Sequence, residues 1–122
     1  MKKILLVDDD QVIVEALTNA LQLRNFQVNS LTDGRKVRSE IEENEYDIIV
    51  LDIVMPNKEG LETIQDVRQI NSTIPILAIS GGGRTTPSSN LEIAKMMGAT
   101  DTMIKPFDSS SLIQKINSIL RN

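Results

Sequence analysis

Short apolar runs alternate along the chain with longer segments whose apolar residues recur every three or four positions. The short runs end at polar or turn-forming residues, which is typical of strands that are buried on both faces. The longer segments place their apolar residues on one face of a helix. The predicted strands are residues 4–7, 26–31, 46–51, 74–79 and 102–104, and the predicted helices are residues 12–25, 37–41, 61–70, 91–97 and 109–120.

Five strand–helix units in succession predict an α/β fold with a doubly wound parallel sheet and helices on both of its faces. The 122 residues have the length of a single domain, so we expect one domain over residues 1–122 and no output domain. Two segments are predicted to be loops. Residues 56–60 contain proline, asparagine and glycine, and residues 80–90 are rich in glycine, serine and threonine.

Polar residues end four of the predicted strands, and these are the residues that we expect to carry chemistry. In an open parallel sheet, ligands bind at the carboxyl ends of the strands. We therefore expect the polar strand ends to converge on one edge of the sheet. They are Asp8-Asp9-Asp10 after the first strand, Asp52 after the third, Ser80 after the fourth and Lys105 after the fifth.

The carboxylates at this edge indicate a metal site. Two unit charges about 4 Å apart repel by roughly 4 kcal/mol at an effective dielectric constant of 20, so Asp8, Asp9 and Asp52 need a cation to stay ionised together. Mg²⁺ suits a site with few carboxylates and several waters, and zinc is disfavoured because the chain has no Cys and no His. Asp10 is instead expected to cap the next helix.

A carboxylate beside Mg²⁺ can act as a nucleophile toward phosphorus and form an aspartyl phosphate, which is the chemistry that we predict for Asp52. Lys105 and the Ser80 hydroxyl would neutralise and position the phosphoryl oxygens, and no general base is required. Each residue also has a simpler interpretation. Asp52 could cap a turn, Lys105 could extend its ammonium to water, and Ser80 could be an ordinary turn residue.

Composition excludes several other classes of function. The net charge is −4, no basic run exceeds two residues, and only three aromatic residues are present, so we expect no direct nucleic-acid partner. No apolar stretch approaches the roughly 18 residues of a membrane span, and the absence of Cys fits a reducing compartment. We therefore expect a cytoplasmic protein without a membrane partner.

Together these residues resemble the receiver domain of two-component response regulators, and the resemblance extends over the whole chain in family order. The matching segments are residues 4–10 (ILLVDDD), 47–56 (DIIVLDIVMP) with Gly60, 79–81 (ISG), 98–99 (GA) and 104–107 (IKPF).

The resemblance implies a flavodoxin-like fold with strand order 2-1-3-4-5. It implies that Asp52 accepts a phosphoryl group from a phosphohistidine on a sensor histidine kinase or a histidine phosphotransfer protein. The implied Mg²⁺ ligands are Asp8, Asp9, Asp52 and the main-chain carbonyl of Val54. Ser80 and Lys105 are implied to contact the phosphoryl oxygens, and the domain is expected to be a signalling switch rather than an enzyme.

Two positions depart from the family pattern. Many members carry Tyr or Phe three residues before the lysine, as part of the switch that also uses the hydroxyl residue, whereas this chain has Thr102. The residue after the hydroxyl is Gly81 where Ala is common, which suggests greater loop mobility. We still expect phosphorylation to act through Ser80 on a docking surface near the fourth helix and fifth strand, for a downstream protein target.

Three alternatives remain at the level of the sequence. A Mg²⁺-dependent phosphatase of the haloacid dehalogenase type would also form an aspartyl phosphate, but its general acid, two residues after the nucleophile, is replaced by Val54. A receiver-like docking module that is never phosphorylated would not need the acidic pair or the lysine, and both are present. A flavin-binding module is compatible with the fold by analogy alone.

Overall fold

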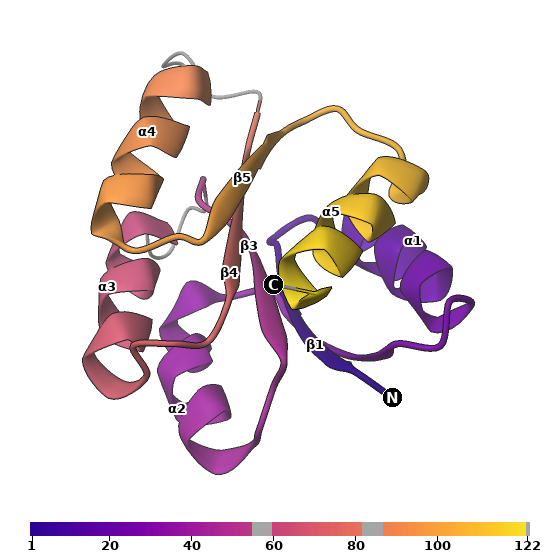
Figure 1. Cartoon of the computed structure of the whole chain (residues 1–122), viewed down its shortest axis with the longest axis horizontal. Helices are drawn as coiled ribbons and strands as arrows, with labels where there is room; N and C mark the ends of the chain where they lie inside the picture. Colours follow the sequence, from indigo (N-terminus) through magenta and orange to yellow (C-terminus); the bar gives the residue numbers. More distant parts are fainter. Residues whose placement is uncertain (55–59, 82–86, 122) are drawn as a thin grey trace.

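The computed structural model describes residues 1–54, 60–81 and 87–121. Strands and helices alternate along these residues, as the apolar pattern predicts (Figure 1). Among the described residues, no helix is long and apolar enough to cross a membrane. The elements are β1 (Lys3–Val7), α1 (Gln11–Gln22), β2 (Gln27–Leu31), the short 3₁₀ helix η1 (Gly34–Lys36), α2 (Val37–Glu43), β3 (Ile48–Asp52), α3 (Gly60–Ile70), β4 (Ile76–Ser80), α4 (Pro87–Met97), β5 (Asp101–Ile104) and α5 (Ser109–Arg121).

The strands form one parallel five-stranded sheet in the order β2-β1-β3-β4-β5, which confirms the predicted α/β fold and its strand order. Helices α1 and α5 cover one face, and α2, α3 and α4 cover the other (Figure 1). The strand order reverses at β1: β2 lies on one side of β1, and β3, β4 and β5 follow on the other, so β1 and β3 are neighbours in the middle of the sheet. This is the arrangement that leaves a crevice at the carboxyl ends of the central strands.

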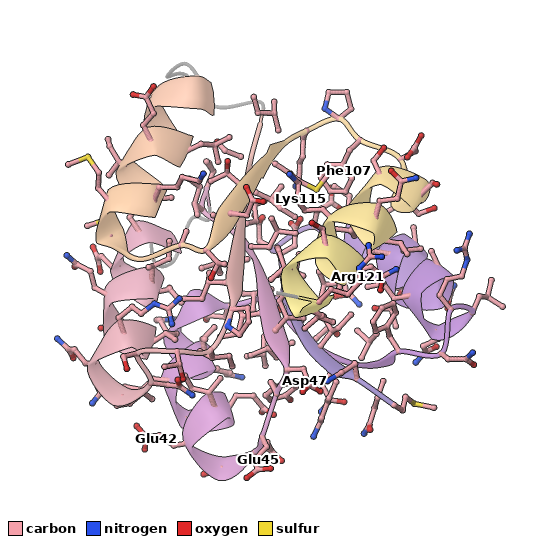
Figure 2. All side chains as sticks on the ribbon, viewed as in Figure 1. Glu42, Glu45, Asp47, Phe107, Lys115 and Arg121 are labelled. Carbon is pink, nitrogen blue, oxygen red and sulfur yellow. The ribbon has the colours of Figure 1, made fainter. Side chains whose placement is uncertain are left out.

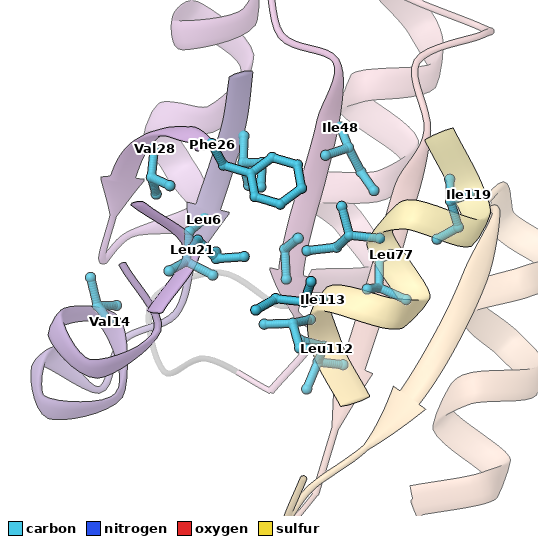
Figure 3. Packing of buried hydrophobic residues seen from close by; sticks show 14 residues of the cluster. Leu6, Val14, Leu21, Phe26, Val28, Ile48, Leu77, Leu112, Ile113 and Ile119 are labelled. Atoms are coloured by element: carbon cyan, nitrogen blue, oxygen red, sulfur yellow. The ribbon is translucent and has the colours of Figure 1, made fainter. Parts of the chain in front are cut away.

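Alternate residues of the central strands enter two separate cores, because successive side chains in a strand point to opposite faces. Ile4 and Leu6 pack with α1 and α5, where Leu21 and Ile116 are fully buried (Figure 3). The intervening Leu5 packs with α2, α3 and α4 in the second cluster. Burial on both faces explains why these strands are continuous apolar runs instead of alternating ones.

Two helices begin at the residues that the sequence indicates. The Asp10 carboxylate accepts hydrogen bonds from the backbone N–H groups of Val12 and Ile13, at 3.0 and 3.4 Å, and caps α1. The Asp108 carboxylate accepts a 2.7 Å bond from the N–H of Ser111 at the start of α5. Both acids satisfy N–H groups that have no partner inside their own helix.

Several predicted boundaries are wrong by a few residues. Helix α1 ends at Gln22 rather than residue 25, because the chain leaves the helix in a turn that contains Asn25, whose φ is +68°. Helix α4 begins at Pro87, within the segment predicted to be a loop, and a proline is well suited to a first helical turn. Gly60, also predicted to lie in a loop, is the first residue of α3. Residues 56–59 and 82–86 of the predicted loops lie outside the described residues.

Candidate functional site

The polar strand ends lie together at the carboxyl edge of the sheet. Val7 is in register with Leu51, Asp52 with Ile79, and Ser80 with Ile104, so the residues that follow or end these strands share one edge. Asp8 and Asp52 are buried, with 3% and 6% of their surface exposed. Two acidic side chains are thus withdrawn from water at the same place, which is costly unless opposite charge compensates them.

Lys105 supplies part of that compensation. Its ammonium group donates to Asp8 Oδ2 at 2.8 Å and to Asp52 Oδ2 at 3.0 Å, and so joins residues from three different strand ends. The sequence prediction that positions 8, 52 and 105 converge is therefore confirmed. The Lys105 side chain is mostly buried, so this bridge is poorly screened by water.

Backbone groups hold the remaining carboxylate oxygens. Asp8 Oδ1 accepts a 2.9 Å hydrogen bond from the N–H of Asp10, and Asp52 Oδ1 accepts a 2.9 Å bond from the N–H of Val54. Each buried carboxylate consequently has one oxygen fixed by the backbone and the other shared with Lys105. Both side chains are fixed in orientation at the edge of the sheet.

Asp9 adds a third, exposed carboxylate. One oxygen from each of Asp8, Asp9 and Asp52 lies within 4.8 Å of the others. Three carboxylates and one ammonium leave a formal charge of −2 at this edge. A small set of carboxylate oxygens with one open, solvent-facing side is the donor set that a hard divalent cation such as Mg²⁺ prefers. The residues present therefore fit the metal that the sequence predicts.

The protonation equilibria reflect the excess negative charge. Burial raises the pKa of the Asp52 carboxyl, against the lowering effects of the Val54 N–H and of Lys105, and the neighbouring Asp8 carboxylate raises it further. Burial disfavours the charged form of Lys105, but its hydrogen bonds to Asp8 and Asp52 outweigh this and raise its pKa. Lys105 is thus held as an ammonium at neutral pH, whereas the anionic form of Asp52 is disfavoured at this edge.

Ser80 and Val54 lie at the same edge, whereas Thr102 lies two residues before the end of β5. Ser80 ends β4, between the strands that carry Asp52 and Lys105, and only 1% of its surface is exposed. Thr102 is half-buried in β5, in register with Ala78. Val54 is 42% exposed, and the role of its carbonyl as a metal ligand stays a prediction.

Sequence reasoning missed three features of the site. The N–H groups of Asp10 and Val54 orient the two buried carboxylates, yet backbone donors have no signature in residue type. The close contact of Gly81 with Lys105 was also missed. The only signal was a glycine at the end of an apolar run, which is more often a sign of a turn.

Comparison with known proteins agrees with this geometry. The family model described as the response regulator receiver domain matches residues 4–117. The chain is 34% identical over 121 residues to the transcriptional regulatory protein CpxR of Escherichia coli, with 99% of this chain and 50% of that protein covered. It is 33% identical over 121 residues to a CpxR homolog of Haemophilus influenzae, with 99% and 51% covered. The chain therefore spans about half the length of these curated relatives.

Solved structures share the fold over nearly the whole chain. The chemotaxis response regulator CheY4 of Vibrio cholerae matches with a TM-score of 0.87 at 27% identity, over 98% of both chains. A two-component response regulator from Clostridium difficile matches with a TM-score of 0.90 at 24% identity, over 100% of this chain and 98% of that one, which supports the fold.

An acidic edge on a five-stranded α/β sheet, with a lysine that bridges two of its carboxylates, defines a phosphoacceptor domain. The chain belongs to the family of response regulator receiver domains, which serve two-component signalling systems.

Proposed function

We propose that Asp52 is the phosphoacceptor of this domain, and that the phosphoryl group comes from a phosphohistidine on a sensor histidine kinase or a histidine phosphotransfer protein. The observation that carries the proposal is the shared ammonium of Lys105, 2.8 Å from Asp8 and 3.0 Å from Asp52. It places a positive charge beside the one buried carboxylate of β3, where negative charge accumulates during phosphoryl transfer.

In the proposed transfer, a carboxylate oxygen of Asp52 forms a bond to phosphorus while the bond from phosphorus to the histidine nitrogen breaks. The bonding electron pair stays with that nitrogen, and the imidazole leaves as a neutral ring once it carries a proton from solvent. Asp52 needs no base because it reacts as the carboxylate. Lys105 and the Ser80 hydroxyl would bind oxygens of the transferred group, since both lie at the same sheet edge.

Asp8, Asp9 and Asp52, with the carbonyl of Val54, are the residues proposed to hold Mg²⁺. When bound, the ion supplies positive charge that lowers the repulsion between the carboxylates and the incoming phosphoryl oxygens. The fit rests on the three carboxylate oxygens that lie within 4.8 Å of one another. Asp8 and Asp52 are already oriented by backbone N–H groups, so the ligands need little rearrangement.

The proposed consequence of phosphorylation is a change in a docking surface formed by α4 and β5 for a downstream protein target. The aspartyl phosphate carries close to two negative charges, in place of the single charge of the Asp52 carboxylate, beside Lys105 and Ser80. Large apolar side chains are exposed on the same two elements: Met96 (86%) and Ile93 (43%) on α4, and Ile104 (50%) on β5. Complete switching from 1:99 to 99:1 needs about 5.5 kcal/mol, so a partial shift of the equilibrium is expected.

Thr102 is proposed to take part in this switch without the aromatic ring that many family members use. A small β-branched side chain cannot sweep out the volume of a ring. The coupling from the site to β5 would therefore depend on Ser80 and on Lys105, whose N–H donates to the Ser80 carbonyl at 2.9 Å.

We propose that the domain is a switch that assists its own phosphorylation and dephosphorylation, and not an enzyme for separate substrates. A phosphatase of the aspartyl-phosphate type needs a general acid beside the nucleophile, and Val54 occupies that position two residues after Asp52. The cytoplasmic location expected from the composition stays a prediction.

The test is intact mass spectrometry after incubation with Mg²⁺ and phosphoramidate, a small phosphoryl donor. One added phosphoryl group is expected on the natural chain and none on Asp52→Asn, which keeps the shape of the side chain. Addition to Asp52→Asn at the same level would contradict the proposed acceptor. Steady release of phosphate from unrelated phosphoesters, without a retained adduct, would favour the phosphatase.

A further inference from the structure

Gly60, the first residue of α3, lies directly on the backbone at the end of β3. It is buried, and its N–H donates to the carbonyl of Ile53 at 3.1 Å. A Cβ atom at position 60 would lie 2.2 Å from the Cα of Ile53 and 2.8 Å from the carbonyl oxygen of Asp52. Carbon atoms in contact normally lie about 3.5–4.0 Å apart. The start of α3 therefore reaches this position only because residue 60 has no side chain.

Space, and not backbone conformation, accounts for the glycine. Among the described residues, the glycine with a positive φ is Gly98, whereas Gly60 is an ordinary first residue of a helix, where alanine has the higher propensity. The nearest atoms belong to the backbone of β3 and of Ile53 rather than to the end of a flexible side chain. An alanine at position 60 would therefore have to move this backbone, or the start of α3, by more than about 1 Å.

The backbone that would move also orients the phosphoacceptor. Ile53 lies between Asp52 and Val54, and the N–H of Val54 donates to Asp52 Oδ1 at 2.9 Å. The other oxygen of Asp52 accepts from Lys105 at 3.0 Å. These two bonds set the direction of the carboxylate. A shift at residue 53 moves the Val54 donor, and so changes how the reacting oxygens are held.

We propose that Gly60 is a positioning residue for phosphoryl transfer to Asp52. Because it has no side chain, α3 can pack onto the end of β3 while the backbone after Asp52 keeps the path that brings the Val54 N–H to the carboxylate. The carbonyl of Val54, which is proposed as a Mg²⁺ ligand, belongs to the same stretch, so the affinity for Mg²⁺ depends on Gly60 as well. The inference rests on the proposed function, because it assigns Gly60 a part in the reaction of Asp52.

The test compares Gly60→Ala with a matched variant, Gly98→Ala. Gly98 has a φ of +123°, and a Cβ there would lie 2.9 Å from Cγ of Arg68, so alanine is strained there too, but at the amino end of the sheet. The first measurement is the nuclear magnetic resonance of the Val54 amide in isotope-labelled protein without Mg²⁺. A charge-assisted hydrogen bond deshields the donor proton, and Asp52→Ala, which lacks the acceptor, gives the reference for a broken bond.

In Gly60→Ala the Val54 amide resonance is expected to move most of the way to its position in Asp52→Ala. Phosphoryl uptake from phosphoramidate, normalised to the folded fraction by circular dichroism, should slow by about tenfold or more, because a displacement of about 1 Å in a reacting site is enough for such a loss. The dissociation constant for Mg²⁺ alone, from thermal melts at several Mg²⁺ concentrations, should rise by about tenfold. Gly98→Ala should lower the melting temperature, leave the amide resonance in place and change both constants by less than about twofold.

A Val54 amide resonance in Gly60→Ala that matches the natural chain would overturn the proposal, and so would an uptake rate within about twofold of the natural one. An equal loss of uptake in Gly98→Ala would also overturn it, because the effect would then be one of general strain.

Two further arrangements keep the result decisive. Added trimethylamine N-oxide keeps a weakened variant folded. The amide resonance is also compared between Asp52→Asn and the double variant with Gly60→Ala, because the amide oxygen of Asn can still accept from Val54 and the buried charge is absent; no change there would overturn the proposal. Failure of the natural chain to take up phosphoryl groups would contradict the proposed function itself, and the amide resonance would still decide whether Gly60 positions the side chain of residue 52.

Discussion

The two ends of the sheet differ in how completely the protein itself compensates the polar and charged side chains there. At the carboxyl end, one ammonium faces three carboxylates, and a formal charge of −2 remains. At the amino end, the half-buried side chains of Arg68 and Tyr46 are hydrogen-bonded to other groups of the protein. In Figure 2, Phe107 lies beyond the carboxyl end of β5, and Asp47 and Glu45 lie near the start of β3, at the opposite end of the sheet.

Arg68 is the clearest example at the amino end. Its guanidinium donates to the carbonyls of Ile74 at 2.7 Å, Gly98 at 2.9 Å and Asn71 at 3.2 Å, and so ties α3 to the turn before β4 and to the end of α4. Burial lowers the pKa of Arg68. These three carbonyls thus share one charged donor, which gives stronger hydrogen bonds than a neutral one.

Tyr46 is the centre of a second closed network at this end. Its hydroxyl donates to Glu40 at 2.6 Å and accepts from Asn29 at 2.9 Å. Burial, followed by the hydrogen bond to Glu40, raises the pKa of Tyr46 to about 12. The hydrogen bonds at the amino end therefore stabilise the fold. At the carboxyl end, the uncompensated negative charge destabilises the fold until a positively charged ligand binds.

The largest expected effect is on the function of the carboxyl end. Lys105→Ala removes the cation that bridges Asp8 and Asp52, and should slow phosphoryl uptake by about 100-fold. Lys115→Ala is the matched control, because Lys115 pairs with Asp101 at 3.3 Å on α5 and β5, outside the acidic cluster. Its uptake rate should be unchanged, and an equal loss in both variants would contradict the assignment.

The next effect is on the stability of the amino end. Arg68→Ala leaves three carbonyls without their charged donor and should lower the free energy of unfolding by about 3 kcal/mol, measured by urea denaturation. Arg38→Ala loses an exposed i,i+4 pair with Glu42 and should cost only about 0.5 kcal/mol. Phosphoryl uptake by folded Arg68→Ala should remain normal, and a loss as large as that of Lys105→Ala would remove the distinction between the two ends.

Mg²⁺ should stabilise the domain through the carboxyl end alone. At a concentration 100 times its dissociation constant, a ligand of the folded state adds about 2.7 kcal/mol to the free energy of unfolding, which a thermal melt detects. Asp9→Ala should abolish most of this increase, since Asp9 is an exposed member of the acidic cluster. Asp47→Ala, at the amino end, should keep it. A Mg²⁺ response that is equal in both variants would place the ion elsewhere.

The smallest effect is on the pH dependence of stability without Mg²⁺. The pKa of Asp52 is raised above its ordinary 3.8, so the folded state binds this proton more tightly than the unfolded state. The contribution of Asp52 to stability therefore falls as pH rises from 3.8 through the raised pKa, and is constant above it. Asp52→Asn should lack this fall and should be at least as stable as the natural chain at neutral pH. The measurement is urea denaturation across this pH range. A free energy of unfolding that rises with pH through the contribution of Asp52 would mean that Lys105 outweighs burial, and would contradict the prediction.

Much of the fold follows from local patterns in the sequence. The run Ile4–Val7 and the run Ile48–Leu51 are continuous and apolar because both faces of the sheet are covered, and this pattern is visible without coordinates. The boundaries were less certain. The start of α4 at Pro87 lies in a stretch rich in serine and threonine, whose propensities favour a loop. Packing of the helix at Leu91 and Ala94 against the sheet outweighs those propensities.

The candidate site was predictable because strand ends carry it. A residue that ends a buried parallel strand must lie at the sheet edge, so Asp8, Asp52 and Lys105 could be brought together by topology alone. The interatomic distances and the hydrogen-bond donors could not be predicted in this way. The bond from the N–H of Val54 to Asp52, and the three carbonyls around Arg68, depend on where the backbone passes in space.

The order of residues along the chain was sufficient to determine the layers of the fold, the edge where acidic residues gather and the class of chemistry that they support, because burial and periodicity are local properties. Only the tertiary structure decided that one ammonium is shared between two carboxylates and that Gly81 lies directly against Lys105. Both facts depend on atoms that are far apart in sequence and a few ångströms apart in space, and contacts of this kind are set by the packing of whole elements.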